Sequence, residues 1–65
     1  MKLILYENKM EVATLDNPIE TIKQFGFPTF FTHQRKLGRT WRLEADEHDT
    51  MQDIMFMNKR LQIVE

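Results

Sequence analysis

The chain has 65 residues, a formal net charge of −1, 42% hydrophobic and 29% charged residues, and no cysteine. These values allow one small domain, residues 1–65, and exclude a fold held by disulfides, while the hydrophobic share argues against a wholly disordered chain. A domain of this length buries only about 60% of its unfolded surface, so we expect a monomer to be marginally stable.

The first part of the chain predicts a β-hairpin over residues 2–15. Lys2–Tyr6 is rich in aliphatic and aromatic side chains, which favour strands. Met10–Leu15 alternates in polarity after a short polar break, which is typical of the second strand of a hairpin. Asn8 suits the turn because asparagine tolerates the left-handed conformation.

A short helix is predicted over residues 18–25. Asn17 is a candidate N-cap, and Pro18 suits the first helical position, where its missing N–H costs nothing. Glu20 is placed to complete a capping box. Gly26 and Pro28 are expected to end the helix.

Residues 28–45 predict a second hairpin. The segment 28–34 is rich in aromatic residues and threonine, so we expect an extended strand, and the segment 39–45 alternates in polarity. Gly38 suits a four-residue loop between them. Trp41 and Leu43 are expected to face the core.

The last third predicts a C-terminal helix over residues 50–61, with a third hairpin as the alternative. Thr50 is a candidate cap, and apolar residues recur at helical spacing from Ile54 onward. In the alternative, residues 54–57 pair with residues 61–64. The predicted fold class is therefore α+β, a small antiparallel sheet with helices over one face.

Charge is segregated along the chain. Lys23–Arg42 contains five cations and no acid, whereas Leu43–Asp53 contains five acids and no cation. Cations around the tip of a two-stranded ribbon can reach phosphates or base edges. The hairpin 33–42 is therefore a candidate partner- or nucleic-acid-binding element, although the same residues also fit a solvated face that pairs with the acids. The candidate residues are Arg35, Lys36, Arg39 and Arg42, with His33 and Trp41 nearby.

The sequence offers little for catalysis or metal binding. It contains no serine and no cysteine, so two common nucleophiles are missing, and we predict no enzymatic activity and no cofactor. The acidic stretch Glu44–Asp49 has no EF-hand spacing, and His48 has no second histidine at a zinc spacing. We therefore predict no metal site.

Neither a membrane span nor a signal peptide is expected. The longest uncharged run, Gln24–Gln34, is too short for a membrane span and is interrupted by Gly26 and Pro28. The N-terminal residues lack the length of apolar stretch that a signal peptide requires. We therefore expect a cytoplasmic protein.

The last third carries more apolar surface than one small sheet can cover. Such surface is typical of interfaces, and segregated charge is typical of electrostatic steering toward a partner. We therefore expect a small regulatory or inhibitory protein that docks onto a larger protein or nucleoprotein, of the kind that phages and mobile elements encode. The alternative is a small nucleic-acid-binding regulator. We also predict a homodimer, with Ile54, Phe56, Met57, Leu61 and Val64 at its interface.

Overall fold

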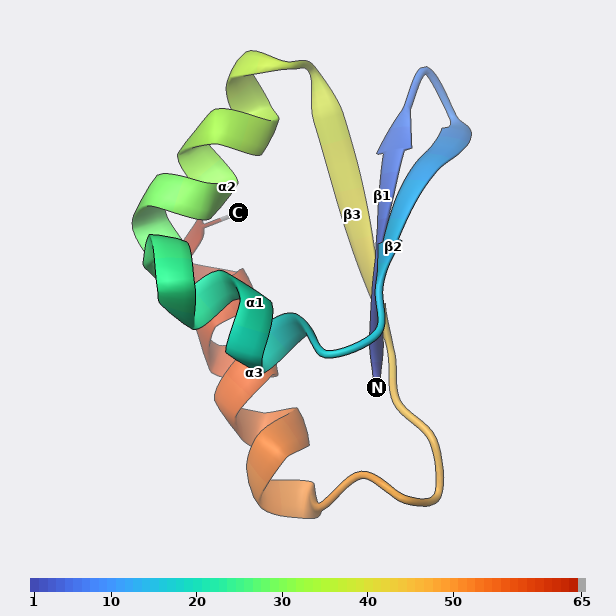
Figure 1. The fold of residues 1–65 in the computed structure, drawn as a ribbon, viewed down its shortest axis with the longest axis vertical. Coiled ribbons are helices and arrows are strands. Elements are labelled where there is room, and N and C mark those ends of the chain that lie inside the picture. Colours follow the sequence, from blue (N-terminus) through green and yellow to red (C-terminus); the bar gives the residue numbers. More distant parts are fainter. Residues whose placement is uncertain (65) are drawn as a thin grey trace.

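The computed structural model describes residues 1–64, with side chains described through residue 62. Within this range, three strands form an antiparallel sheet in the order β2-β1-β3, and the helices all lie on one face of it (Figure 1). The elements are β1 (Lys2–Glu7), β2 (Met10–Leu15), α1 (Pro18–Phe25), α2 (Phe27–Lys36), β3 (Arg39–Glu44) and α3 (Met51–Val64). The predicted α+β class, with helices over one face of a small sheet, is confirmed.

The N-terminal hairpin is confirmed. Asn8 and Lys9 have φ angles of 53° and 67°, so both central residues of the turn are left-handed, as a tight hairpin turn requires. β1 is the central strand of the sheet and pairs with β2 on one side and β3 on the other. Its residues Leu3 and Leu5 are buried in the core.

The first helix is confirmed with the predicted bounds. Asn17 stands at the N-cap, and its backbone carbonyl accepts a 3.0 Å hydrogen bond from the Thr21 N–H. The expected side-chain cap is not formed, because the Asn17 side chain makes no hydrogen bond to the helix start. Gly26 ends α1 with a φ of 84°, and its N–H donates to the Ile22 carbonyl at 2.8 Å.

The second predicted hairpin is wrong. Its first half is the helix α2, not a strand, and β3 pairs with β1 instead of with residues 28–34. Pro28 lies in the first turn of α2, where its missing N–H breaks no helical hydrogen bond. The Pro28 that was expected to end α1 therefore helps to begin the next helix.

Tertiary packing explains why this aromatic segment is helical. Phe27, Phe31 and Gln34 follow the helical spacing i, i+4, i+7, so they share one face of α2. Phe31 and Gln34 are buried, and the Phe31 ring lies 4.8 Å from the Trp41 ring, measured between centroids. This burial outweighs the intrinsic preference of phenylalanine and threonine for strands, which is weak and depends on context.

The strand predicted over residues 39–45 is confirmed. β3 covers Arg39–Glu44, and Trp41 and Leu43 pack against the core as expected. Gly38 has a φ of 74° and joins α2 to β3. The strand alternates half-buried and exposed residues, as an edge strand with one face on the core should.

The C-terminal helix is confirmed, and the alternative of a third hairpin is excluded. α3 starts where predicted and extends a few residues past the predicted end. The Thr50 hydroxyl accepts a 3.2 Å hydrogen bond from the Asp53 N–H, which is an N-cap contact. None of the helices in residues 1–64 is long and apolar enough to cross a membrane.

The core lies between the sheet and the helical layer. Its buried members come from β1 and from all three helices: Leu3, Leu5, Ile22, Phe31, Met57 and Leu61. α2 therefore covers part of the apolar face of α3. The predicted excess of apolar surface on the last third followed from treating residues 28–34 as a strand, which would have left α3 with less to pack against.

Candidate functional site

The four basic residues predicted as a binding site do not form one ribbon surface. Arg35 and Lys36 are exposed in the last turn of α2. Arg39 is half-buried at the start of β3, where its Nη1 donates a 2.9 Å hydrogen bond to Oε1 of the buried Gln34. Arg42 is exposed further along β3 and pairs with Glu44.

The prediction of a hairpin over residues 33–42 is therefore wrong, because residues 33–36 belong to the helix α2. Two of its cations are already engaged within the chain, Arg39 with Gln34 and Arg42 with Glu44. His33 is exposed on α2, and Trp41 is half-buried against Phe31. Of the four predicted cations, Arg35 and Lys36 are exposed neighbours at the end of α2, and Arg35 also lines a hollow with Arg39 and Trp41. We call His33, Arg35 and Lys36 the basic end of α2.

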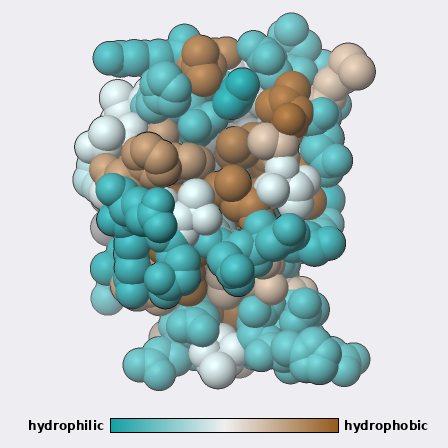
Figure 2. Space-filling model, viewed as in Figure 1, coloured by the Kyte–Doolittle hydropathy of each residue, from teal (hydrophilic) through white to brown (hydrophobic). Residues whose placement is uncertain are grey.

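Beside the basic end of α2 lies an apolar groove that the sequence analysis did not predict. It is lined by Phe25, Thr29, Phe30, His33 and Gln34, has a volume of about 410 Å³, and is called here the α1–α2 groove. Phe25, at the end of α1, is 62% exposed, and its ring centroid lies 6.5 Å from that of Phe30. In Figure 2, apolar side chains gather over the junction of α1 and α2, among hydrophilic ones.

The groove exists because α1 and α2 are joined by a single residue. Gly26 ends α1 and precedes α2, and its φ of 84° lies in the region that glycine adopts without strain. This turn brings Phe25 next to Phe30. The pattern Gly26-Phe27-Pro28 could have identified the helix start, because proline in a first turn after glycine is a recognised helix signal.

A second aromatic cluster joins α3 to the other helices. The Phe27 and Phe56 rings meet edge to face at 5.5 Å between centroids. The Arg60 guanidinium lies 3.5 Å from the Phe56 centroid, and Lys23 lies 5.9 Å from the same ring. Both cations stack on aromatic faces inside the chain, so we assign this cluster a structural role.

The residues predicted for self-association lie mainly in the core of one chain. Met57 and Leu61 are buried, and Ile54 and Phe56 are half-buried, whereas the Val64 side chain lies outside the described residues. Among the α3 side chains described, through residue 62, the exposed large apolar ones are Met51 and Met55. Self-association stays a prediction, and burial of Met57 and Leu61 means that it would have to use other residues.

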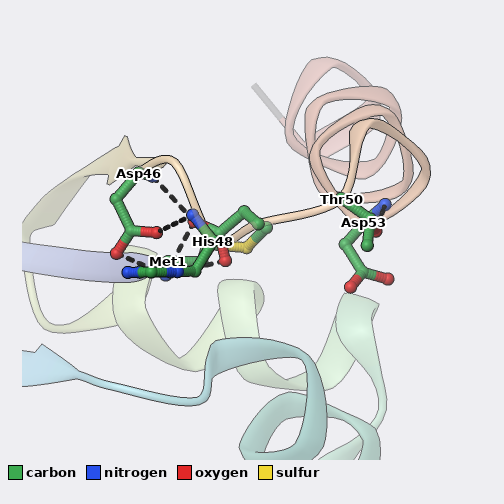
Figure 3. Close-up of polar contacts among 6 residues, drawn as sticks. Met1, Asp46, His48, Thr50 and Asp53 are labelled. Carbon is green, nitrogen blue, oxygen red and sulfur yellow. Dashed lines mark hydrogen bonds and ion pairs between the residues drawn. The ribbon is translucent and has the colours of Figure 1, made fainter.

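The acidic loop between β3 and α3 binds the N-terminus. Asp49 pairs with the Met1 α-amino group at 2.8 Å, and Asp46 lies 3.8 Å from it (Figure 3). Within the loop, the His48 N–H donates to Asp46 Oδ1 at 2.8 Å. Among the residues with described side chains, no three His, Asp or Glu groups are placed to hold a metal ion.

The ion pair between Met1 and Asp49 shifts the pKa values of both groups. The hydrogen bond to Asp49 raises the pKa of the Met1 α-amino group above its ordinary value, against a smaller opposing effect of burial. The same bond, with a further one from the Asp46 N–H, lowers the pKa of Asp49. The stabilisation from Asp49 is complete above the ordinary carboxyl pKa and is lost as pH falls through the depressed value. The stabilisation from the Met1 α-amino group is complete below its ordinary pKa and is lost as pH rises through the raised pKa.

We therefore expect Asp49→Asn to lower the unfolding midpoint most near pH 6, where both partners are charged. The difference from wild type should shrink toward pH 3 and again above pH 9, because one partner then becomes neutral in the wild type too. Urea unfolding followed by circular dichroism across this range measures it. Glu47→Gln, an exposed change in the same loop, is the control, and an equal pH-dependent loss there would contradict the assignment.

Compared with known proteins, the chain matches no family model, no curated protein and no solved structure. Function is therefore inferred from the geometry of the described residues alone.

Proposed function

We propose that the chain is a small non-enzymatic regulatory or inhibitory protein that docks onto a larger protein through the α1–α2 groove. The observation that carries the proposal is the exposed Phe25 ring beside Phe30, at the mouth of an apolar groove. An exposed aromatic side chain next to a concave apolar surface is typical of the buried anchors of protein interfaces.

The charge pattern supports the same surface. Arg35 and Lys36 are exposed at the end of α2, next to the groove lining residues His33 and Gln34. A polar, charged rim around an apolar centre is the usual anatomy of an interface, and the rim charges set partner choice and association rate. The proposal assigns no reaction, because the sequence lacks serine and cysteine and the acids Asp46 and Asp49 bind the N-terminus.

A nucleic-acid-binding regulator remains the alternative proposal, with Arg35 and Lys36 as its phosphate contacts. It is less well supported, because Arg39 and Arg42 make contacts within the chain and do not join those two on a common ribbon. Few phosphate contacts predict weak binding, since each neutralised phosphate contributes to affinity through counterion release.

A site-specific photo-crosslinker tests the docking surface in cells that express the chain. We expect benzoylphenylalanine at Phe25 to capture one partner protein, and the same probe at Met10 to capture none. Met10 is a matched control because it is 71% exposed and lies on β2, away from the groove. Equal capture at both positions, or none at either, contradicts the proposal. Nuclease-sensitive adducts at Phe25 would favour the alternative.

A further inference from the structure

The α1–α2 groove also indicates the chemistry of its occupant. Building on the proposed function, we propose that the occupant is an acidic segment of a partner protein, which places a large apolar side chain between Phe25 and Phe30. Two features of the chain lead to this proposal: the apolar floor of the groove and the absence of acids among the residues that line it.

The groove suits one or two large side chains. Its volume of about 410 Å³ is within the range of small ligand sites. Phe25 and Phe30 supply aromatic surface, and Phe30 in turn meets the buried Phe31 edge to face at 5.1 Å between centroids. Phe30 is therefore held from behind by the core, so one wall of the groove is fixed before binding, which lowers the entropy cost of docking.

The surroundings of the groove are basic. No aspartate or glutamate occurs between residues 21 and 43, the segment that forms most of α1, all of α2 and most of β3. Thr29 and His33 separate the groove from a second hollow of about 360 Å³, which Lys36 also lines. A segment lying across α2 would therefore meet His33 and Lys36 in succession.

The acidic loop between β3 and α3 lies at the other end of the molecule from the groove-side cations. In Figure 1 the basic end of α2 is at the top of the molecule, whereas the loop from β3 to α3, with Asp46 and Asp49, is at the bottom. Glu7 pairs with Arg39 in the sheet at the upper end, and neither residue lines the groove. Opposite charges attract across an interface and like charges repel, so an acidic partner is favoured at the groove and a basic one is disfavoured.

A peptide fits this surface better than a nucleic acid. The groove lining is largely aromatic and threonine-bearing, and the exposed cations beside it are few, because Arg39 and Arg42 are engaged within the chain. A polyphosphate strand needs a run of cations along its backbone. An acidic peptide needs one apolar anchor and a few carboxylates, which this surface matches.

An unbiased selection tests the inference. The purified full chain is presented with a displayed library of random 12-residue peptides, and the recovered peptides are sequenced and synthesised. We expect them to be enriched in Asp and Glu and to share one Leu, Phe or Trp. Binding measured by fluorescence anisotropy should weaken several-fold from 50 to 200 mM NaCl, because salt screens exposed charges.

Matched variants then locate the binding. Phe25→Ser should weaken peptide binding at least tenfold, whereas Met10→Ser, another exposed apolar position, should leave it unchanged. The double variant Arg35→Glu/Lys36→Glu should weaken it at least fivefold at 50 mM NaCl. The charge-matched control Lys2→Glu/Lys9→Glu, with both lysines exposed on β1 and its turn, should not. Circular dichroism confirms that each variant is folded.

The outcomes separate this inference from the proposed function. Peptides that bind at Phe25 but carry no acidic excess overturn the inference and leave docking at the groove supported. Peptides whose binding survives Phe25→Ser overturn both. Recovery of no peptide above background overturns the inference, whereas a Phe25-specific protein crosslink would still support docking. Tighter binding of a 12-nucleotide single strand, competing with the peptide, would replace the acidic segment with a nucleic acid.

Discussion

Met57→Asp should unfold the monomer. Met57 is completely buried among core residues from β1, α1 and α2. The substitution removes apolar contacts and places a carboxyl group where water cannot reach it, at a cost of about 4 kcal/mol or more. The whole stability of a domain of this length is about 3 to 10 kcal/mol at 0.05 to 0.15 kcal/mol per residue. We expect circular dichroism to show loss of cooperative thermal unfolding.

Two further variants make the Met57 result specific. Met55→Asp, two residues earlier in α3, should unfold close to wild type because Met55 is 64% exposed. Met57→Leu conserves volume and should cost less than about 1.5 kcal/mol. If Met57→Asp instead remains a well-folded monomer and the wild type sediments as a dimer, then Met57 belongs to an interface between chains, and the packing described here is wrong.

Phe31→Ala should produce the second large loss. Phe31 is 1% exposed and packs against the Trp41 and Phe30 rings, so truncation leaves a cavity at the meeting point of α2 and β3. Large-to-small changes of buried phenylalanine cost about 3 to 5 kcal/mol. Urea denaturation followed by tryptophan fluorescence measures the loss, and Trp41 reports directly on the affected contact.

Phe25→Ala is the matched control for Phe31→Ala. Phe25 is exposed, so the same chemical change should alter the free energy of unfolding by only about 0.5 kcal/mol. The pair also tests the packing of α2 on the core, since Phe31 is buried there and Phe25 is not. Equal losses at both positions would contradict the structure. A small effect at Phe25 would also show that the groove variants remain folded.

Because residues 28–34 belong to the helix α2 and not to a strand, the apolar surface left exposed differs from the one predicted. With residues 28–34 as a strand, the C-terminal helix has unburied apolar surface, and a homodimer is the natural way to cover it. With α2 present, Met57 and Leu61 are buried within one chain. The exposed apolar surface that we propose for docking then lies at Phe25, which received no functional role from the sequence.

Local signals in the sequence determined most of the elements. Asn8 marked the first turn, Pro18 marked the start of α1, alternation marked β3, and Thr50 marked the start of α3. Each of these signals acts within a few residues, so it needs no knowledge of the rest of the chain. The segregation of cations before Arg42 from acids after it was equally visible, because charge order is a property of the sequence.

Tertiary packing alone decided α2, the strand order and the groove. The aromatic and threonine-rich segment 28–34 favours a strand locally, but as a helix it buries Phe31 and Gln34 against β3 and the rest of the core. β3 pairs with β1, far away in sequence, which gives the order β2-β1-β3. The groove follows from the turn at Gly26, and Arg42 lies away from the end of α2 because it stands further along β3. These features depend on contacts between distant residues, whose burial outweighs the weak local preferences on which the sequence prediction relied.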